Sequence, residues 1–210
     1  MSLPYDPVQA SLDLAAADPR LGDLIAQVGP PTLTLRPDET ADSLVRSVVY
    51  QQLSGKAAAT IHGRLLEAVG DGGRLSPQAV VAATDDALRA CGLSRAKVAS
   101  VRDIAQRHLD GDLPPRDVLA ALPDSDVVKT LLPVRGVGVW TVQMFLMFNL
   151  GRPDVWPIGD LGVQEGFRRI GGLSERPTPK ALDAMGEAYR PWRSVAAWYG
   201  WRAVDLDLAP

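Results

Sequence analysis

Asp160 is the residue of this chain whose sequence context best suits charge-based chemistry. It lies in the segment WPIGDLGVQ, directly before an apolar-periodic run, which is the position of a helix N-cap. A carboxylate there is held ionised by backbone amides and by the helix dipole. Such a group is a poor proton donor, but it can stabilise positive charge in a transition state and orient an attacking water. The alternative is that Asp160 only caps the helix, and the two roles are compatible.

A glycine hairpin in the segment LLPVRGVGVWTV, residues 131–142, is the second candidate site. Pro133 is expected to end the preceding helix, because proline lacks an amide donor and disfavours helical geometry at the residue before it. Gly136 and Gly138 allow positive φ and close backbone approach. Amides of the hairpin and of the next helical turn then converge, which suits a phosphate. A plain helix–helix turn, with glycines for tightness, explains the spacing equally well.

Short helices are predicted to position both candidates. Apolar residues recur at helical spacing nearly throughout, separated by Pro, Gly, Asp and Ser. The segment LPDSDVVKTLL is expected to start at a cap formed by Asp124 or Ser125, and Ser54 to cap the helix that follows it. Only TLTLRP, Thr32 to Pro37, alternates like a strand. The sequence therefore predicts an all-α fold of about ten short helices, including ranges 38–52, 139–150, 160–170, 178–189 and 191–204.

Composition excludes several kinds of protein. The net charge of −3 argues against holding polyanions by bulk positive charge, although a phosphate site made of backbone amides stays compatible with it. The single cysteine, Cys91, excludes a disulfide framework and a four-cysteine metal site, and two histidines disfavour a zinc enzyme. The N-terminus lacks a signal-peptide pattern, and no run is long enough to cross a membrane. We expect a cytoplasmic protein.

Several segments together resemble one family. LPVRGVGVWTVQMFLMFNLGRPDVWPIGDLGV is similar to the helix-hairpin-helix element of the base-excision DNA glycosylase superfamily, closest to its 3-methyladenine DNA glycosylase II branch. VVYQQLSGKAAATIHGRL, CGLSRAKVASVRDIA and AYRPWRSVAAWYGW also resemble segments of that family, and together they cover most of residues 40–203. The resemblance implies two helical lobes with a DNA-binding cleft between them. One lobe would comprise residues 1–37 and 142–210, and the other residues 38–141.

The resemblance also implies roles for individual residues. Asp160 matches the catalytic aspartate, with Asp154 and Glu165 as nearby alternatives that do not match. Main-chain amides of the hairpin, Val134, Arg135, Gly136, Val137 and Gly138, would bind a DNA phosphate, with a monovalent cation at the hairpin carbonyls. Arg135 stands where the family often has proline. Leu53 matches the wedge that fills the gap left by a flipped base, although an ordinary contact at a helix junction is the alternative.

Trp140 occupies the position at which strand-cleaving relatives carry a Schiff-base lysine. Without an amine there, imine chemistry of that type is not available, so the chain is expected to leave an abasic site. Trp140, Met144 and Trp201 are the implied base pocket, because a flipped base stacks on aromatic faces and an N-alkylated purine carries a positive charge. Trp192 and Trp198 are expected to belong to the core.

We therefore expect a monofunctional DNA glycosylase that excises alkylated bases from double-stranded DNA in base excision repair. It would act as a monomer, without a cofactor or catalytic metal, in the cytoplasm in association with the nucleoid. The first alternative is another base specificity on the same scaffold, such as an oxidised or mismatched base. The second is a non-catalytic helix-hairpin-helix module that only binds DNA.

Overall fold

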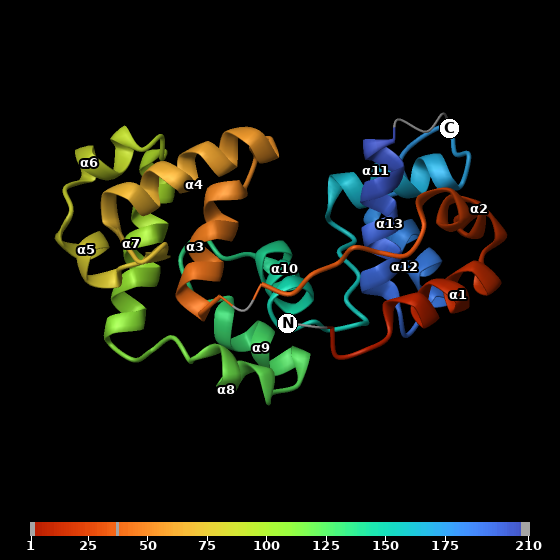
Figure 1. Cartoon of the computed structure of the whole chain (residues 1–210), viewed down its shortest axis with the longest axis horizontal. Coiled ribbons are helices and arrows are strands. Elements are labelled where there is room, and N and C mark those ends of the chain that lie inside the picture. Colours follow the sequence, from red (N-terminus) through yellow and green to blue (C-terminus); the bar gives the residue numbers. More distant parts are fainter. Residues whose placement is uncertain (1–2, 37, 207–210) are drawn as a thin grey trace. The chain divides into compact units, whose positions relative to one another are not determined.

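The computed structural model describes residues 3–36 and 38–206, and nearly all regular structure within them is helical (Figure 1). These residues form thirteen α-helices, one 3₁₀ turn and a single pair of dipeptide strands. The predicted all-α fold is confirmed, with more and shorter helices than expected.

The chain divides into two compact units. Unit 1 comprises residues 1–36 and 146–210, and unit 2 comprises residues 37–145. The second boundary lies between Phe145 and Leu146, within helix α10 (Val139–Phe148).

Unit 1 is built from helices at both ends of the chain. They are α1 (Pro7–Ala17), α2 (Pro19–Val28), α11 (Leu161–Ile170), α12 (Pro179–Gly186), the 3₁₀ turn η1 (Glu187–Tyr189) and α13 (Arg193–Asp205). Asp6 and Asp18 cap α1 and α2 by accepting amide hydrogen bonds, and each is followed by a proline at the first helical position. Phe167 and Tyr199 are fully buried at the centre of this unit.

Unit 2 is a bundle of short helices, four of which are capped by a serine or threonine side chain. Its helices are α3 (Thr40–Tyr50), α4 (Gly55–Val69), α5 (Pro77–Ala82), α6 (Asp85–Ala90), α7 (Arg95–Leu109), α8 (Arg116–Ala120), α9 (Asp124–Leu131) and the first part of α10. Ser54 caps α4 as predicted, by accepting the Ala57 amide. Leu44, Leu65 and Ile104 are fully buried and form part of its core.

Two local predictions are wrong. Residues 32–36 form no strand, and Pro37 lies outside the described residues. The strands are instead β1 (Gly70–Asp71) and β2 (Arg74–Leu75), an antiparallel pair closed by Gly72 and Gly73, both with positive φ. Helix α9 begins at Asp124 itself, with Pro123 in the cap position and no side-chain cap bond, so neither Asp124 nor Ser125 caps it.

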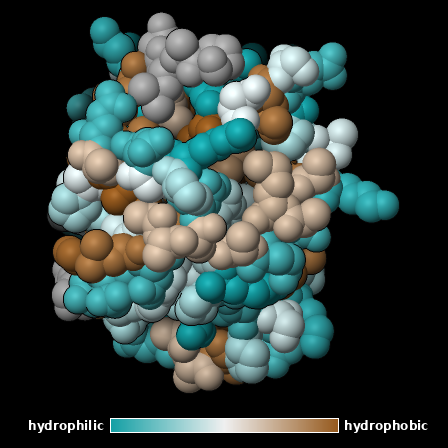
Figure 2. All heavy atoms as spheres, turned by 90° about the vertical axis from the view of Figure 1, so that its right-hand side faces the viewer, coloured by the Kyte–Doolittle hydropathy of each residue, from teal (hydrophilic) through white to brown (hydrophobic). Residues whose placement is uncertain are grey.

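Figure 2 shows hydrophilic side chains interspersed with small groups of hydrophobic ones over one face of the molecule. Within the described ranges, no helix combines the length and the apolar character that a membrane crossing requires.

Candidate functional site

Asp160 lies at the N-terminus of helix α11, in a loop that hydrogen bonds hold from both sides. Its own amide donates to the Pro157 carbonyl (2.9 Å), and the Gln164 side chain donates to the Ile158 carbonyl (2.8 Å). Oδ1 of Asp160 accepts the amide of Val163 at 2.8 Å, so the residue is the N-cap that its sequence context predicted. The carboxylate is therefore fixed at the positive end of a helix dipole.

The indole of Trp201 fixes the same carboxylate oxygen. Its Nε1–H, on helix α13, donates to Oδ1 of Asp160 at 3.0 Å, and its ring stacks on Phe148 with centroids 5.9 Å apart. Two N–H donors on one carboxylate oxygen restrict its rotation. This contact was not predicted: Trp201 was expected only as a residue of the base pocket, and the structure shows that it also donates a hydrogen bond to Asp160.

Asp154 and Glu165, the alternatives to Asp160, both form ion pairs with arginines. Asp154 accepts two hydrogen bonds from Arg193, at 2.6 and 2.9 Å, and one from Arg190 at 2.7 Å. Glu165 pairs with Arg168 and Arg169, whose hydrogen bonds lower its pKa to about 2. Both carboxylates thus have structural roles, which leaves Asp160 as the candidate for chemistry.

The glycine hairpin of unit 2 follows helix α9, which ends before Pro133 as predicted. Val134 and Val137 are buried and anchor the hairpin, while Arg135, Gly136 and Gly138 are exposed. Gly136 has φ +79°, and a side chain there would collide with Ser100, whose Cβ would be 2.8 Å away. Gly138 has no positive φ, and a Cβ added there would meet no heavy atom within 4 Å. Gly136 therefore adopts the positive φ that glycine allows and Gly138 does not, while the close approach of both glycines to a phosphate stays a prediction.

Hydrogen bonds already engage part of the hairpin backbone. The Arg135 amide donates to Oδ2 of Asp103 (2.9 Å), and the Val137 amide donates to the Val134 carbonyl (3.0 Å). Among the described residues, the amides of Gly136 and Gly138 have no such acceptor. Any phosphate bound by this hairpin would therefore be held by the two glycine amides rather than by all five residues from Val134 to Gly138.

Backbone carbonyls of the hairpin are the remaining candidates for a cation. The Gly136 carbonyl accepts a hydrogen bond from Nε2 of Gln51 at 2.9 Å. Because each carbonyl oxygen has two lone pairs, one of them is left for a cation. No cluster of three or more His, Cys, Asp or Glu side chains suited to a metal ion occurs among residues 3–36 and 38–206. The monovalent cation stays a prediction.

The loop that carries Leu53 is tied to this hairpin. Besides the Gly136 carbonyl, Nε2 of Gln51 donates to Oγ1 of Thr141 (3.1 Å). The Lys97 ammonium donates to the carbonyls of Val49 (2.8 Å) and Gln51 (2.9 Å), and burial lowers the pKa of this lysine. Lys97 thus holds the C-terminal end of α3 in place.

Leu53 is 40% exposed, so it is not the core contact that was its alternative interpretation. Gln52, directly before it, has φ +58°, a backbone conformation that few residues other than glycine adopt. A braced loop that presents an exposed leucine fits a wedge, although the wedge role itself stays a prediction.

Trp140 and Met144 are one turn apart on α10 and share a helix face. Trp140 is half-buried and Met144 is buried. Both belong to unit 2, whereas Trp201 belongs to unit 1, so the three-residue base pocket stays a prediction. Trp198 is buried as expected, but Trp192 is half-exposed and donates from Nε1 to Oδ2 of Asp13 at 2.8 Å.

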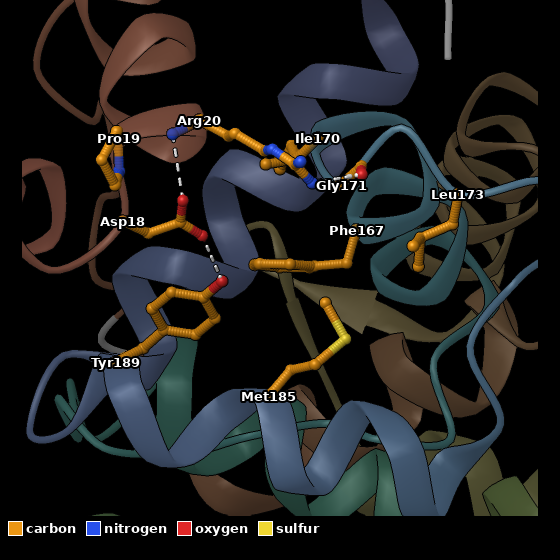
Figure 3. Close-up of a pocket in the computed structure, with 9 residues that line it drawn as sticks. All are labelled: Asp18, Pro19, Arg20, Phe167, Ile170, Gly171, Leu173, Met185 and Tyr189. Atoms are coloured by element: carbon orange, nitrogen blue, oxygen red, sulfur yellow. Dashed lines mark hydrogen bonds between the residues drawn. The ribbon is translucent and has the colours of Figure 1, made fainter.

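A hollow of about 370 Å³ at the opposite end of α11 is lined by apolar side chains and a few polar ones (Figure 3). Its polar groups serve the fold. Oδ2 of Asp18 accepts the Tyr189 hydroxyl at 2.7 Å while Oδ1 caps α2, and Arg20 donates to the Gly171 carbonyl at 2.6 Å. Burial and the neighbouring Asp18 raise the pKa of Tyr189. This hollow therefore lacks a group placed for chemistry, in contrast to the Asp160 end of the same helix.

Known proteins with similar sequences are repair enzymes by name. The chain is 32% identical over 200 residues to DNA-3-methyladenine glycosylase 1 of Schizosaccharomyces pombe, covering 94% of this chain and 88% of that protein. The solved structure of the S. pombe 3-methyladenine DNA glycosylase Mag1 in complex with abasic DNA matches with a TM-score of 0.90 at 31% identity, over 96% of this chain and 99% of that one. A DNA-3-methyladenine glycosidase from Bacillus halodurans matches with a TM-score of 0.77 at 35% identity, over 96% and 91% of the two chains.

A family model describes most of the same region. The model of the HhH-GPD superfamily of base excision DNA repair proteins matches residues 45–191, which include the Leu53 loop, the glycine hairpin and Asp160. This chain belongs to the HhH-GPD superfamily of base excision DNA repair proteins.

Proposed function

We propose that this chain is a DNA glycosylase that removes alkylated bases, such as 3-methyladenine and 7-methylguanine, from double-stranded DNA in base excision repair. It hydrolyses the N-glycosidic bond and leaves an abasic site. Membership of the repair superfamily and the names of its relatives support this function. The observation that carries it is the Asp160 carboxylate, which is held by the Val163 amide and the Trp201 indole.

Asp160 stabilises the positive charge of the transition state and does not donate a proton. As the glycosidic bond opens, positive charge develops at C1′ of the sugar, and a fixed carboxylate lowers the energy of that state. The same carboxylate orients the water that attacks C1′. An N-alkylated purine already carries a positive charge and is a good leaving group, so this mechanism needs no general acid.

The substrate base is extruded from the duplex, because its glycosidic bond is not accessible in the stack. Trp140, Met144 and Trp201 are the residues that we propose to contact it. An indole face attracts a cationic base by about 0.5–2 kcal/mol, which favours an alkylated purine over an undamaged one. Leu53 is the proposed wedge that fills the gap, supported by its exposure beside a braced loop.

DNA is bound through its backbone. We propose that the amides of Gly136 and Gly138 bind one phosphate, as suits a protein without excess positive charge. The enzyme would act as a monomer in the compartment that holds the DNA.

Strand cleavage is not part of the proposed activity. Trp140 has no amine, and the Lys97 ammonium is bound to two backbone carbonyls. A lysine-type imine intermediate therefore has no nucleophile at the matching position.

Another base specificity on the same scaffold is the main rival, and a purely DNA-binding module is the second. A binding module gains nothing from a carboxylate directed at anionic DNA, so the fixed Asp160 disfavours it. The test is a panel of duplexes that each contain one lesion: 3-methyladenine, 7-methylguanine, 8-oxoguanine or a mismatched thymine. We expect free base from the first two and strand breaks only after alkali. Release from the oxidised or mismatched duplex alone would establish the rival specificity, no release at all would favour the binding module, and breaks without alkali would refute monofunctionality.

A further inference from the structure

Helix α11 turns two glycines, Gly162 and Gly166, toward helix α13. Being four residues apart, they lie on one helix face, separated by a single turn. A methyl group on Gly166 would overlap the backbone of Gly200, whose carbonyl carbon would be 2.5 Å away and whose Cα would be 2.6 Å away. The two helix backbones are therefore in contact at this point, which requires glycine.

This backbone contact brings Trp201, the next residue after Gly200, to the first turn of α11, where Gly162 lies. A methyl group on Gly162 would be 2.9 Å from Cδ1 and 3.2 Å from Nε1 of Trp201, and 3.1 Å from Oδ1 of Asp160. Carbon atoms in favourable contact stand about 3.5–4.0 Å apart. The hydrogen bond from Trp201 to Asp160 therefore has the space it needs because residue 162 has no side chain.

We propose that Gly162 is a positioning residue for the reaction: it keeps the space in which the Trp201 indole holds the Asp160 carboxylate. The inference rests on the proposed function, because it assigns a cause to the orientation of the proposed catalytic group. Gly162 itself touches no reacting atom and acts through Trp201.

An alanine at position 162 is compatible with the fold of α11. Gly162 has no positive φ, so its backbone conformation suits any residue, and alanine favours a helix more than glycine does. The nearest neighbour of the added methyl group is the Trp201 ring, a half-exposed side chain and not a backbone segment. The substitution therefore separates the indole from Oδ1 without the backbone overlap that a side chain at Gly166 would cause.

The experiment compares Gly162→Ala with wild type and with Gly63→Ala, a glycine inside helix α4 that has no atom within 4 Å of an added methyl group. Three quantities are measured for each: the single-turnover rate of base release from methylated duplex DNA, the Kd for that duplex, and the melting temperature. For Gly162→Ala we expect the rate to fall about tenfold or more, as for the loss of a hydrogen bond to a charged group, with Kd unchanged. Gly63→Ala should match wild type in rate and in Kd and melt at the wild-type temperature or above it.

A double-mutant cycle shows whether Gly162 acts through Trp201. In a Trp201→Ala background the added methyl group meets only Oδ1 of Asp160, at 3.1 Å, and no longer an indole, so Gly162→Ala should cause a much smaller loss of rate than it does in wild type. The inference would be overturned if the rate losses of the two substitutions multiply, or if Gly162→Ala keeps the wild-type rate. It would also be overturned if the rate loss of Gly162→Ala follows the folded fraction alone. A wild-type chain that releases no base refutes the proposed function and this inference with it, whereas an active wild type with an unaffected Gly162→Ala variant refutes the inference alone.

Discussion

The substitution Trp201→Phe tests whether the indole N–H holds the Asp160 carboxylate. Phenylalanine keeps an aromatic ring against Phe148 but removes the donor that lies 3.0 Å from Oδ1. Hydrogen bonds to charged groups contribute about 1.5–3 kcal/mol, which corresponds to a rate factor of about 10–150. Because the Val163 amide still binds Oδ1 at 2.8 Å, the carboxylate keeps one anchor. We therefore expect a loss near the lower limit, about tenfold.

The assay is single-turnover base release from methylated duplex DNA with enzyme in excess, which isolates the chemical step from product release. Trp192→Phe is the matched control. It removes an indole N–H bond of 2.8 Å to another carboxylate of unit 1, that of Asp13, away from Asp160. We expect this control to keep its rate per folded molecule. A Trp201→Phe enzyme that folds and retains the wild-type rate, or a Trp192→Phe enzyme that loses rate equally, would refute the reasoning.

Two further predictions concern the hairpin and the stability in acid. Gly136→Ala should lower the urea midpoint of unfolding and weaken DNA binding, because φ +79° costs alanine about 1–2 kcal/mol and its Cβ meets Ser100. Gly138→Ala should leave the midpoint unchanged, since its φ is not positive and its Cβ meets no heavy atom. Equal midpoints for the two variants would contradict this account of the hairpin. The pKa of Glu165 is lowered to about 2 by Arg168 and Arg169, so its stabilisation is complete above its ordinary value of 4.5 and is lost as the pH falls toward 2. Glu165→Gln should therefore be less stable than wild type at neutral pH and approach it in acid; a stability difference that does not depend on pH would rule out this ion pair as its cause.

The sequence was most informative where a residue type has one strong local consequence. Asp160 before a helical run predicted the N-cap, and Pro133 predicted the end of α9, because both effects depend on the adjacent backbone alone. Pro123 shows the limit of this reasoning, since it takes the cap position that Asp124 or Ser125 was expected to fill.

Contacts between distant segments could not be predicted in this way. The Trp201–Asp160 bond joins residues 41 positions apart, and the Gln51–Gly136 bond joins residues 85 positions apart. One feature did point toward the first of them: glycines at positions 162 and 166, four residues apart inside a helix, indicate close approach by another backbone. Their partner, Gly200, becomes apparent only when α11 and α13 are packed together.

Asp160→Asn gives the most direct test of the central claim, that the charge of Asp160 drives release of the base. Asparagine is as good an N-cap as aspartate, and its carbonyl oxygen can accept both the Val163 amide and the Trp201 indole, so the fold should persist. The measurement is the single-turnover rate of free-base release from methylated duplex DNA, with the Kd for DNA and the melting temperature as controls. We predict a loss of at least about 100-fold, as for removal of one preorganised electrostatic group from an active site, with binding and melting unchanged. An Asp160→Asn enzyme that releases base at the wild-type rate would contradict the account.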